Sequence, residues 1–173
     1  MQAMSAITVA DERSVNLALN HPLPAQTIDV SSFEFLVNEE VYNIESIEID
    51  PSNSLVLIIT LSDYLHYQDN IMINHTGGVI NSDYNSVLGA LIDFPVENNL
   101  EERFYIPGLI QAESFTNQSG LVTENTTDTG GGLNIGYTDL NDYAEYPVFI
   151  SQSGIYDLNL RVAAQWQSGQ IEI

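Results

Sequence analysis

Residues 55–61 read Leu-Val-Leu-Ile-Ile-Thr-Leu, and this stretch decides the fold class of the chain. In a strand, alternate side chains point to opposite faces, so the four leucine and isoleucine side chains at odd positions share one face. The other face is also largely apolar, which predicts a buried, central strand of a sheet. The preceding Asp-Pro-Ser-Asn at residues 50–53 favours a chain reversal.

The same alternation recurs on both sides of this strand. Apolar residues alternate in residues 14–19 and in residues 71–74, before a break at two glycines. A possible helix start at Ser31-x-x-Glu34 is outweighed by the strand-like alternation of residues 33–37. Short alternating runs, broken by turn residues roughly every eight to twelve positions, are typical of β-sandwiches. The sequence therefore predicts an all-β chain.

Composition excludes several classes of partner. The 173 residues carry a net charge of -21, with three arginines and no lysine. Such a surface repels the phosphates of nucleic acids, so we expect no nucleic-acid binding, and anionic membranes are disfavoured for the same reason. The acidity itself has two interpretations, which are solubility in a salty exterior and binding of divalent cations.

The sequence shows no sign of disulfides, of a membrane span or of an export signal. Cysteine is missing, which rules out disulfides and zinc–thiolate sites. The longest apolar stretch is far too short to cross a bilayer, and the first residues have no basic and apolar leader pattern. We expect an internal piece of a larger exported protein, located outside the cell or on its surface.

A domain boundary is predicted in the polar, aperiodic segment of residues 97–103. Glycine, threonine, asparagine and tyrosine become frequent after it. The expected domains are residues 1–100 and residues 104–173.

The first domain has strand patterns at residues 33–38 and 41–61, then Gln-Asp-Asn-Ile-Met-Ile-Asn-His-Thr-Gly-Gly at residues 68–78 and Phe-Pro-Val-Glu-Asn at residues 94–98. This pattern resembles the SwmB-type bacterial Ig-like modules of large surface and secreted proteins. The resemblance implies an Ig-like β-sandwich that serves as a spacer. His75 could be read as a metal ligand, but no second histidine lies at a suitable spacing, which favours an ordinary strand-end histidine.

The second domain contains four sequence blocks, at residues 106–115, 123–137, 141–148 and 153–163. In content, order and spacing these blocks resemble the family 6 carbohydrate-binding modules. The resemblance covers residues 105–173 and implies a jelly-roll β-sandwich that is non-catalytic and binds a polysaccharide or oligosaccharide.

Within these blocks, Glu124 and Tyr137 flank a Gly-Gly-Gly tract that permits close backbone approach. Sugars present an apolar C–H face and a ring of hydroxyls, which an aromatic platform and a carboxylate can bind. We therefore predict Tyr137 as the platform and Glu124 as the charged acceptor. The resemblance implies that both line a cleft among the loops at one end of the sandwich. The alternative is that Tyr137 is a half-buried strand residue.

Two further aromatic residues are candidate ligand contacts. Tyr143 stands where many family members have Trp, a position that in some members belongs to a second site on the sheet face; it could equally be a core residue. Trp166 lies among polar residues before a glycine, which suggests exposure and a contact surface, although packing against the neighbouring domain is an equal alternative.

A structural calcium ion is the expected cofactor. Gln111 and Glu113 lie two apart in the expected opening strand and would share a face. The resemblance implies that this pair binds calcium together with backbone carbonyls and an acidic residue near the end of the domain. An ordinary surface pair is the alternative.

The family's sandwich needs about eight strands, more than residues 104–173 supply. The fold expected for the whole chain is therefore an Ig-like β-sandwich followed by an incomplete jelly-roll β-sandwich. Either the half-domain folds differently, or the missing half comes from a longer chain or from a second chain. It would carry a second aromatic opposite Tyr137 and the last calcium ligand, so the 173-residue chain alone is expected to bind soluble sugars very weakly or not at all.

The sequence shows no catalytic centre, since no carboxylate pair, Ser-His-Asp arrangement, phosphate loop or zinc motif has the required context. We expect a non-catalytic accessory region of a secreted polysaccharide-degrading enzyme, namely a glycoside hydrolase. The alternative is a segment of a cell-surface adhesin or structural repeat protein. Flanking sequence would discriminate between the two.

Overall fold

The structure is a computed structural model that describes every residue except 128, 131 and 164–169. The described residues form strands and loops, and their one helical element is the 3-10 turn η1 (Val30–Ser32). The all-β class is therefore confirmed. Within the described residues, no helix has the length and apolar character needed to span a bilayer.

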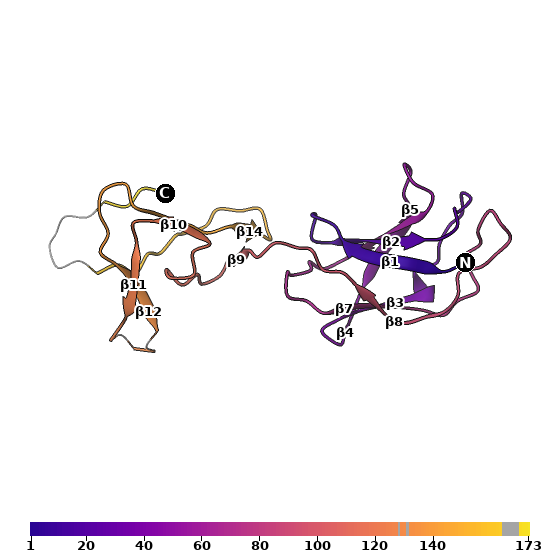
Figure 1. The fold of residues 1–173 in the computed structure, drawn as a ribbon, viewed down its shortest axis with the longest axis horizontal. Helices are drawn as coiled ribbons and strands as arrows, with labels where there is room; N and C mark the ends of the chain where they lie inside the picture. Colours follow the sequence, from indigo (N-terminus) through magenta and orange to yellow (C-terminus); the bar gives the residue numbers. More distant parts are fainter. Residues whose placement is uncertain (128, 131, 164–169) are drawn as a thin grey trace. The chain divides into compact units, whose positions relative to one another are not determined.

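The chain forms two compact units, which we call unit 1 (Met1–Glu102) and unit 2 (Arg103–Ile173) (Figure 1). Unit 1 has two four-stranded antiparallel sheets. The first sheet has the order β1 (Ala3–Thr8), β2 (Ser14–Leu19), β6 (Val56–Leu61), β5 (Ile44–Ile49). The second has the order β4 (Glu40–Tyr42), β3 (Phe33–Val37), β7 (Ile71–His75), β8 (Leu91–Val96).

The strand order of unit 1 is that of an immunoglobulin-like sandwich. If β1 to β8 are lettered A, B, C, C′, D, E, F and G in chain order, the sheets read A-B-E-D and C′-C-F-G. Immunoglobulin folds place A, B, E and D in one sheet and C, F and G in the other. The expected Ig-like architecture is thus present, whereas the SwmB-type resemblance remains a prediction.

Alternation along the strands builds the core of unit 1. Each inner strand directs every second side chain between the sheets, as in β2, where Val15, Leu17 and Leu19 are buried. The largest fully buried side chains are Phe35, Leu17, Leu57, Ile59, Leu61, Leu65, Ile71, Ile73, Ile80, Leu88, Val15 and Val37. Loop residues such as Leu65 and Leu88 therefore close the ends of the sandwich.

Strand β6 has the central position that the sequence predicts, because it pairs with β2 on one side and β5 on the other. Leu57, Ile59 and Leu61 have no solvent exposure. Leu55, expected on the same face, instead precedes the strand and is 38% exposed. Its carbonyl accepts the N–H of Leu19, so the backbone pairing continues beyond the point where the side chain is covered.

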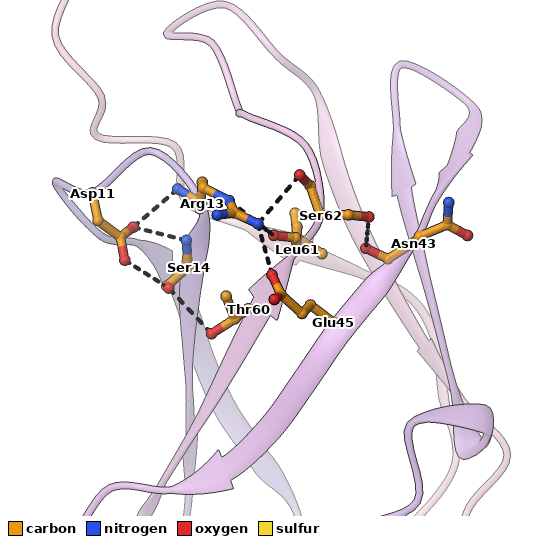
Figure 2. Close-up of polar contacts among 8 residues, drawn as sticks. All are labelled: Asp11, Arg13, Ser14, Asn43, Glu45, Thr60, Leu61 and Ser62. Carbon is orange, nitrogen blue, oxygen red and sulfur yellow. Dashed lines mark hydrogen bonds and ion pairs between the residues drawn. The ribbon is translucent and has the colours of Figure 1, made fainter. Parts of the chain in front are cut away.

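Arg13 links three segments at one end of unit 1, as Figure 2 shows. Its Nη2 donates to the carbonyls of Leu61 (2.7 Å) and Ser62 (3.2 Å) and forms an ion pair with Glu45 (2.7 Å). Its backbone N–H donates to Oδ1 of Asp11 at 2.9 Å. The start of β2, the end of β6 and the start of β5 are thereby held together.

The polar segment of residues 97–102 is hydrogen bonded to unit 1. The Nδ2 of Asn98 donates to the carbonyl of His66 at 2.7 Å, and the N–H of Asn99 donates to Oγ1 of Thr8 at 2.9 Å. The expected linker is therefore largely anchored before the chain enters unit 2.

The described residues of unit 2 form three two-stranded sheets. One is parallel and joins β9 (Phe104–Ile106) to β14 (Val148–Ile150). The antiparallel pairs are β10 (Asn117–Ser119) with β13 (Tyr143–Glu145) and β11 (Val122–Asn125) with β12 (Leu133–Gly136).

None of the described residues of unit 2 is buried. Edge-to-face aromatic contacts occur between Tyr105 and Phe149, with ring centroids 5.5 Å apart, but they enclose no core. Residues 155–162 alternate apolar and polar side chains, yet the structure assigns them to no strand and Leu158 is 64% exposed. Unit 2 thus has strand-like apolar faces, and none of its described residues forms a second layer over them.

Candidate functional site

The two candidate sugar-binding residues belong to the β11–β12 hairpin of unit 2. Its register pairs Glu124 with Asn134 and Val122 with Gly136. The connecting loop contains the glycine tract, in which Gly130 and Gly132 have φ values of 102° and 96°. Glycine adopts this left-handed region without steric cost, so the tract allows the hairpin to close.

Glu124 is held on one face of the hairpin. Oε1 of Glu124 accepts a hydrogen bond from Nδ2 of Asn134 at 3.3 Å. A Cβ atom added to Gly136 would lie 2.8 Å from the same oxygen. The carboxylate therefore occupies the space that the missing side chain of Gly136 leaves, and it remains exposed to solvent.

Tyr137 follows β12 directly and is 75% exposed. Its φ of 56° lies in the left-handed region, which is an uncommon conformation for a bulky residue. Such strained residues cluster at ligand sites. The alternative of a half-buried strand residue is therefore wrong, because the chain leaves the ladder before this position and turns the ring toward solvent.

The other two aromatic candidates lie elsewhere. Tyr143 is in β13, pairs with Ser119, and is 46% exposed, so it is not a core residue. It belongs to a different two-stranded sheet from Glu124 and Tyr137. Trp166 lies outside the described residues.

The predicted opening strand with Gln111 and Glu113 side by side is wrong. Strand β9 ends at Ile106, and the next residues are Pro107 and Gly108, of which proline has no N–H to extend a ladder. Gln111 then begins a turn in which its carbonyl accepts the N–H of Ser114 at 3.0 Å. Gln111 and Glu113 therefore do not lie on one face of a strand.

Glu113 instead lies near the glycine tract and Tyr146. A Cβ added to Gly132 would be 3.9 Å from Oε1 of Glu113. Tyr146 donates its hydroxyl to the carbonyl of Ala112 at 2.5 Å, and burial together with the charge of Glu113 raises the pKa of Tyr146.

Calcium takes about six to eight oxygen ligands. Across the described residues, no three His, Cys, Asp or Glu side chains gather in a way that could hold a metal ion. Calcium binding by Gln111 and Glu113 stays a prediction.

Residues 111–173 match the family model named carbohydrate binding module (family 6). The matched segment contains the β11–β12 hairpin, Tyr137 and Tyr143. The match supports a family 6 region in unit 2 and, with it, carbohydrate binding by a non-catalytic module.

Among solved structures, the chain is similar to one titled the crystal structure of the N-terminal part of the bacterial S-layer protein SbsC. The two share 14% sequence identity with a TM-score of 0.47, and the alignment covers 77% of this chain. The chain corresponds to 37% of the length of that structure. A likeness at this level assigns neither fold nor function.

Sequence reasoning missed Asn134 and Gly136 as parts of the site. Both become visible only once the hairpin register is known, because Asn134 is the direct cross-strand partner of Glu124. The alternation of residues 133–136 contained the signal, since a hairpin around the glycine tract brings residues 124 and 134 opposite each other.

Proposed function

We propose that unit 2 binds carbohydrate as a non-catalytic accessory region of a secreted polysaccharide-degrading enzyme, namely a glycoside hydrolase. The family match over residues 111–173 supports the binding role. The observation that carries the proposal at the level of residues is the exposed, conformationally strained Tyr137, immediately after the strand that holds the Glu124–Asn134 pair.

In the proposed site, the ring of Tyr137 stacks on the apolar C–H face of a sugar ring. The carboxylate of Glu124 accepts hydrogen bonds from sugar hydroxyls, and Asn134 orients that carboxylate from the opposite strand. Tyr143, on the β10–β13 sheet, is the candidate for a separate contact.

Unit 1 is proposed to be a spacer of the SwmB type. Its packed core and the hydrogen-bonded segment of residues 97–102 support that role, because a spacer must be rigid enough to hold neighbouring domains apart. Because Ig-like sandwiches also occur as tandem adhesive modules, a cell-surface adhesin is the second candidate function. The domain that neighbours this chain in its full reading frame would discriminate between the two.

Unit 2 is further proposed to be completed by additional polypeptide, from a longer chain or from a second chain. The exposed apolar side chains support this, since Leu109 is 86% and Leu140 is 91% exposed. Stacking on one ring contributes only about 0.5–1.5 kcal/mol beyond area burial, whereas immobilising a ligand costs several kcal/mol. Completion should therefore be needed for tight binding.

Isothermal titration with oligosaccharides of xylan, β-glucan and agarose tests the site. We expect little or no heat from the 173-residue chain and clear binding by a version that carries the completing strands. In that version Tyr137→Ala should abolish binding and Tyr137→Phe should retain it. Binding that survives Tyr137→Ala would reject the hairpin site and favour Tyr143.

Structural calcium, with ligands from Glu113, Gln111 and the completing polypeptide, remains part of the proposal. A metal bound only by the folded state raises the melting temperature by mass action. We expect calcium to raise the melting temperature of completed unit 2 and Glu113→Ala to remove that increment. The matched control is Glu48→Ala, which deletes an exposed carboxylate of unit 1. An unchanged calcium response in Glu113→Ala would exclude Glu113 as a ligand.

A further inference from the structure

Two loops at one end of unit 1 are joined by hydrogen bonds. One follows β2, and the other connects β7 to β8. The N–H of Asn81 donates to Oε1 of Gln26 at 3.2 Å, and Nε2 of Gln26 donates back to the carbonyl of Asn81 at 2.7 Å. The N–H of Asp83 donates to the carbonyl of Pro22 at 3.1 Å. In the lettering above these are the B–C and F–G loops, which carry binding residues in immunoglobulin variable domains.

Side chains also fix the tip of the β7–β8 loop, residues 82–86. Oγ of Ser82 accepts the N–H groups of Tyr84 (3.2 Å) and Ser86 (3.3 Å), which leaves its own proton for Oγ of Ser86 at 2.7 Å. Oγ of Ser86 in turn lies 2.8 Å from Nδ1 of His21. The backbone that carries Tyr84 is therefore preorganised.

Tyr84 is nevertheless 67% exposed. The rings of Tyr84 and His21 meet edge to face, with centroids 5.2 Å apart and an interplanar angle of 61°, so His21 does not lie flat on Tyr84. Asp83 and Asn85, its two neighbours in sequence, are both exposed. An aromatic ring that is held in place and largely exposed contributes little to the core of unit 1 and leaves apolar surface for a ligand.

We propose that the loop tip of residues 82–86 is a carbohydrate-contact surface in unit 1, with a neutral saccharide ring stacked on Tyr84. The carboxylate of Asp83 would accept hydrogen bonds from sugar hydroxyls, and the amide of Asn85 would both donate and accept them. This surface is separate from the site proposed in unit 2.

The chemistry of the loop favours a neutral sugar over other partners. Arg13 is the only Lys or Arg in residues 1–102, and it lies beside the start of β2, whereas the loop tip contacts His21 beyond the end of that strand. The N-terminal ammonium of Met1 is near the loop but donates to the carbonyl of Val87 at 2.8 Å. The exposed carboxylate of Asp83 next to Tyr84 disfavours anionic sugars. The other large apolar side chains exposed in this loop are Val79 and Val87. A protein interface usually buries about 800 Å² per partner, which is more than one aromatic ring and two valines provide.

The test is an amide ¹H–¹⁵N spectrum of the full chain carrying Tyr137→Ala, so that the proposed unit 2 site is removed. Hexasaccharides of xylan, mixed-linkage β-glucan and agarose are added separately, up to about 10 mM, a range that detects weak binding. We expect chemical-shift changes at residues 82–86 and His21 with at least one sugar. Adding Tyr84→Ala should weaken the affinity at least about fivefold, and adding Tyr84→Phe should retain it.

The outcomes separate this inference from the proposed function of unit 2. Unchanged shifts of β6 and β7 amides in Tyr84→Ala verify that unit 1 remains folded. If the chain without Tyr137→Ala shows shifts only around residues 122–137, the unit 2 site stands and the Tyr84 surface is rejected. An unchanged affinity at residues 82–86 in Tyr84→Ala, or the absence of shifts there with all three sugars, also rejects it.

Discussion

Unit 1 and unit 2 both consist of strands, but among the described residues only unit 1 has a buried core. In β2 of unit 1, Leu17 and its alternate neighbours are covered completely. In residues 155–162 of unit 2, a similar alternation leaves Leu158 at 64% exposed and Leu160 at 51%. Alternation creates an apolar face on a strand, but only a second layer turns that face into a core.

The stable core and the candidate binding residues of the hairpin therefore lie in different units. Unit 1 holds its shape through packing between two sheets, whereas the hairpin of unit 2 places Glu124 and Tyr137 in solvent. If the proposed completion of unit 2 is right, binding at that hairpin depends on the polypeptide that covers its apolar faces. The loop tip at Tyr84 combines both properties, because an exposed ring is carried by a packed unit.

The largest expected contrast is in hydrogen exchange. Amides of β2, β6 and β7 should open only with global unfolding, which costs about 5–15 kcal/mol in typical domains, whereas β11 and β12 should open locally at far lower cost. We expect protection at least about a thousandfold greater in the first group, measured by NMR or mass spectrometry. Comparable protection in both groups would mean that unit 2 is packed after all.

A core truncation should affect the two units very differently. Phe35 is fully buried, so Phe35→Ala should lower the free energy of unfolding of unit 1 by about 3–5 kcal/mol. The matched variant Phe149→Ala removes a partly exposed ring of unit 2 and should leave the urea midpoint of unit 1 unchanged. Both are measured by far-ultraviolet circular dichroism. Equal losses in the two variants would contradict the contrast in burial.

The Arg13 network offers a smaller test within unit 1. Arg13→Ala leaves the carbonyls of Leu61 and Ser62 without this donor and should cost about 1–3 kcal/mol of unfolding free energy. Glu45→Ala removes only the exposed ion pair and should cost less than about 1 kcal/mol. Urea titrations of both variants measure the two losses of unfolding free energy. A larger loss in Glu45→Ala would show that the ion pair, rather than the backbone contacts, stabilises this corner.

The smallest expected effect is the pH dependence of His75. Its Nδ1 donates to the carbonyl of Ser32 at 2.9 Å, and Nε2 is buried without a hydrogen-bond partner among the described residues. Burial lowers the pKa of His75 below its ordinary value of 6.5, although the bond to Ser32 opposes this. Protonation then favours the unfolded chain, so this stability is present above pH 6.5 and is lost as the pH falls toward the folded pKa.

His75→Asn should therefore make the urea midpoint flatter between about pH 7 and pH 5, the range in which histidine changes charge. Carboxylates affect the stability in a lower pH range than His75 does. Hydrogen bonds from Ser31 lower the pKa of Asp29, and those from Ser52 lower the pKa of Asp50, so the stability they add is lost only as the pH falls below 3.8. An unchanged slope in His75→Asn would mean that His75 does not titrate on unfolding in this range.

Local pattern was sufficient for the inner strands of unit 1 but not for the geometry of the sites. The alternation of residues 55–61 predicted a central strand, because apolar side chains on both faces have few other placements. The strand forms over residues 56–61, between β2 and β5. The strand expected through Gln111 and Glu113 failed, because Pro107 and Gly108 follow β9 and the chain then turns. The exposure of Tyr84 also escaped prediction, since no periodic pattern covers a loop tip.

The sequence by itself determined the all-β class, the alternating faces of the inner strands and the acidic composition, because these depend on side-chain chemistry and on the two-residue period of a strand. Only the tertiary structure decided that Asn134 faces Glu124, that Tyr137 leaves the ladder and that Tyr84 is held by His21 and Ser82. The physical reason is that register, positive φ and contacts between loops depend on which segments meet in space. Those contacts form between residues far apart in the chain, so no short stretch of sequence specifies them.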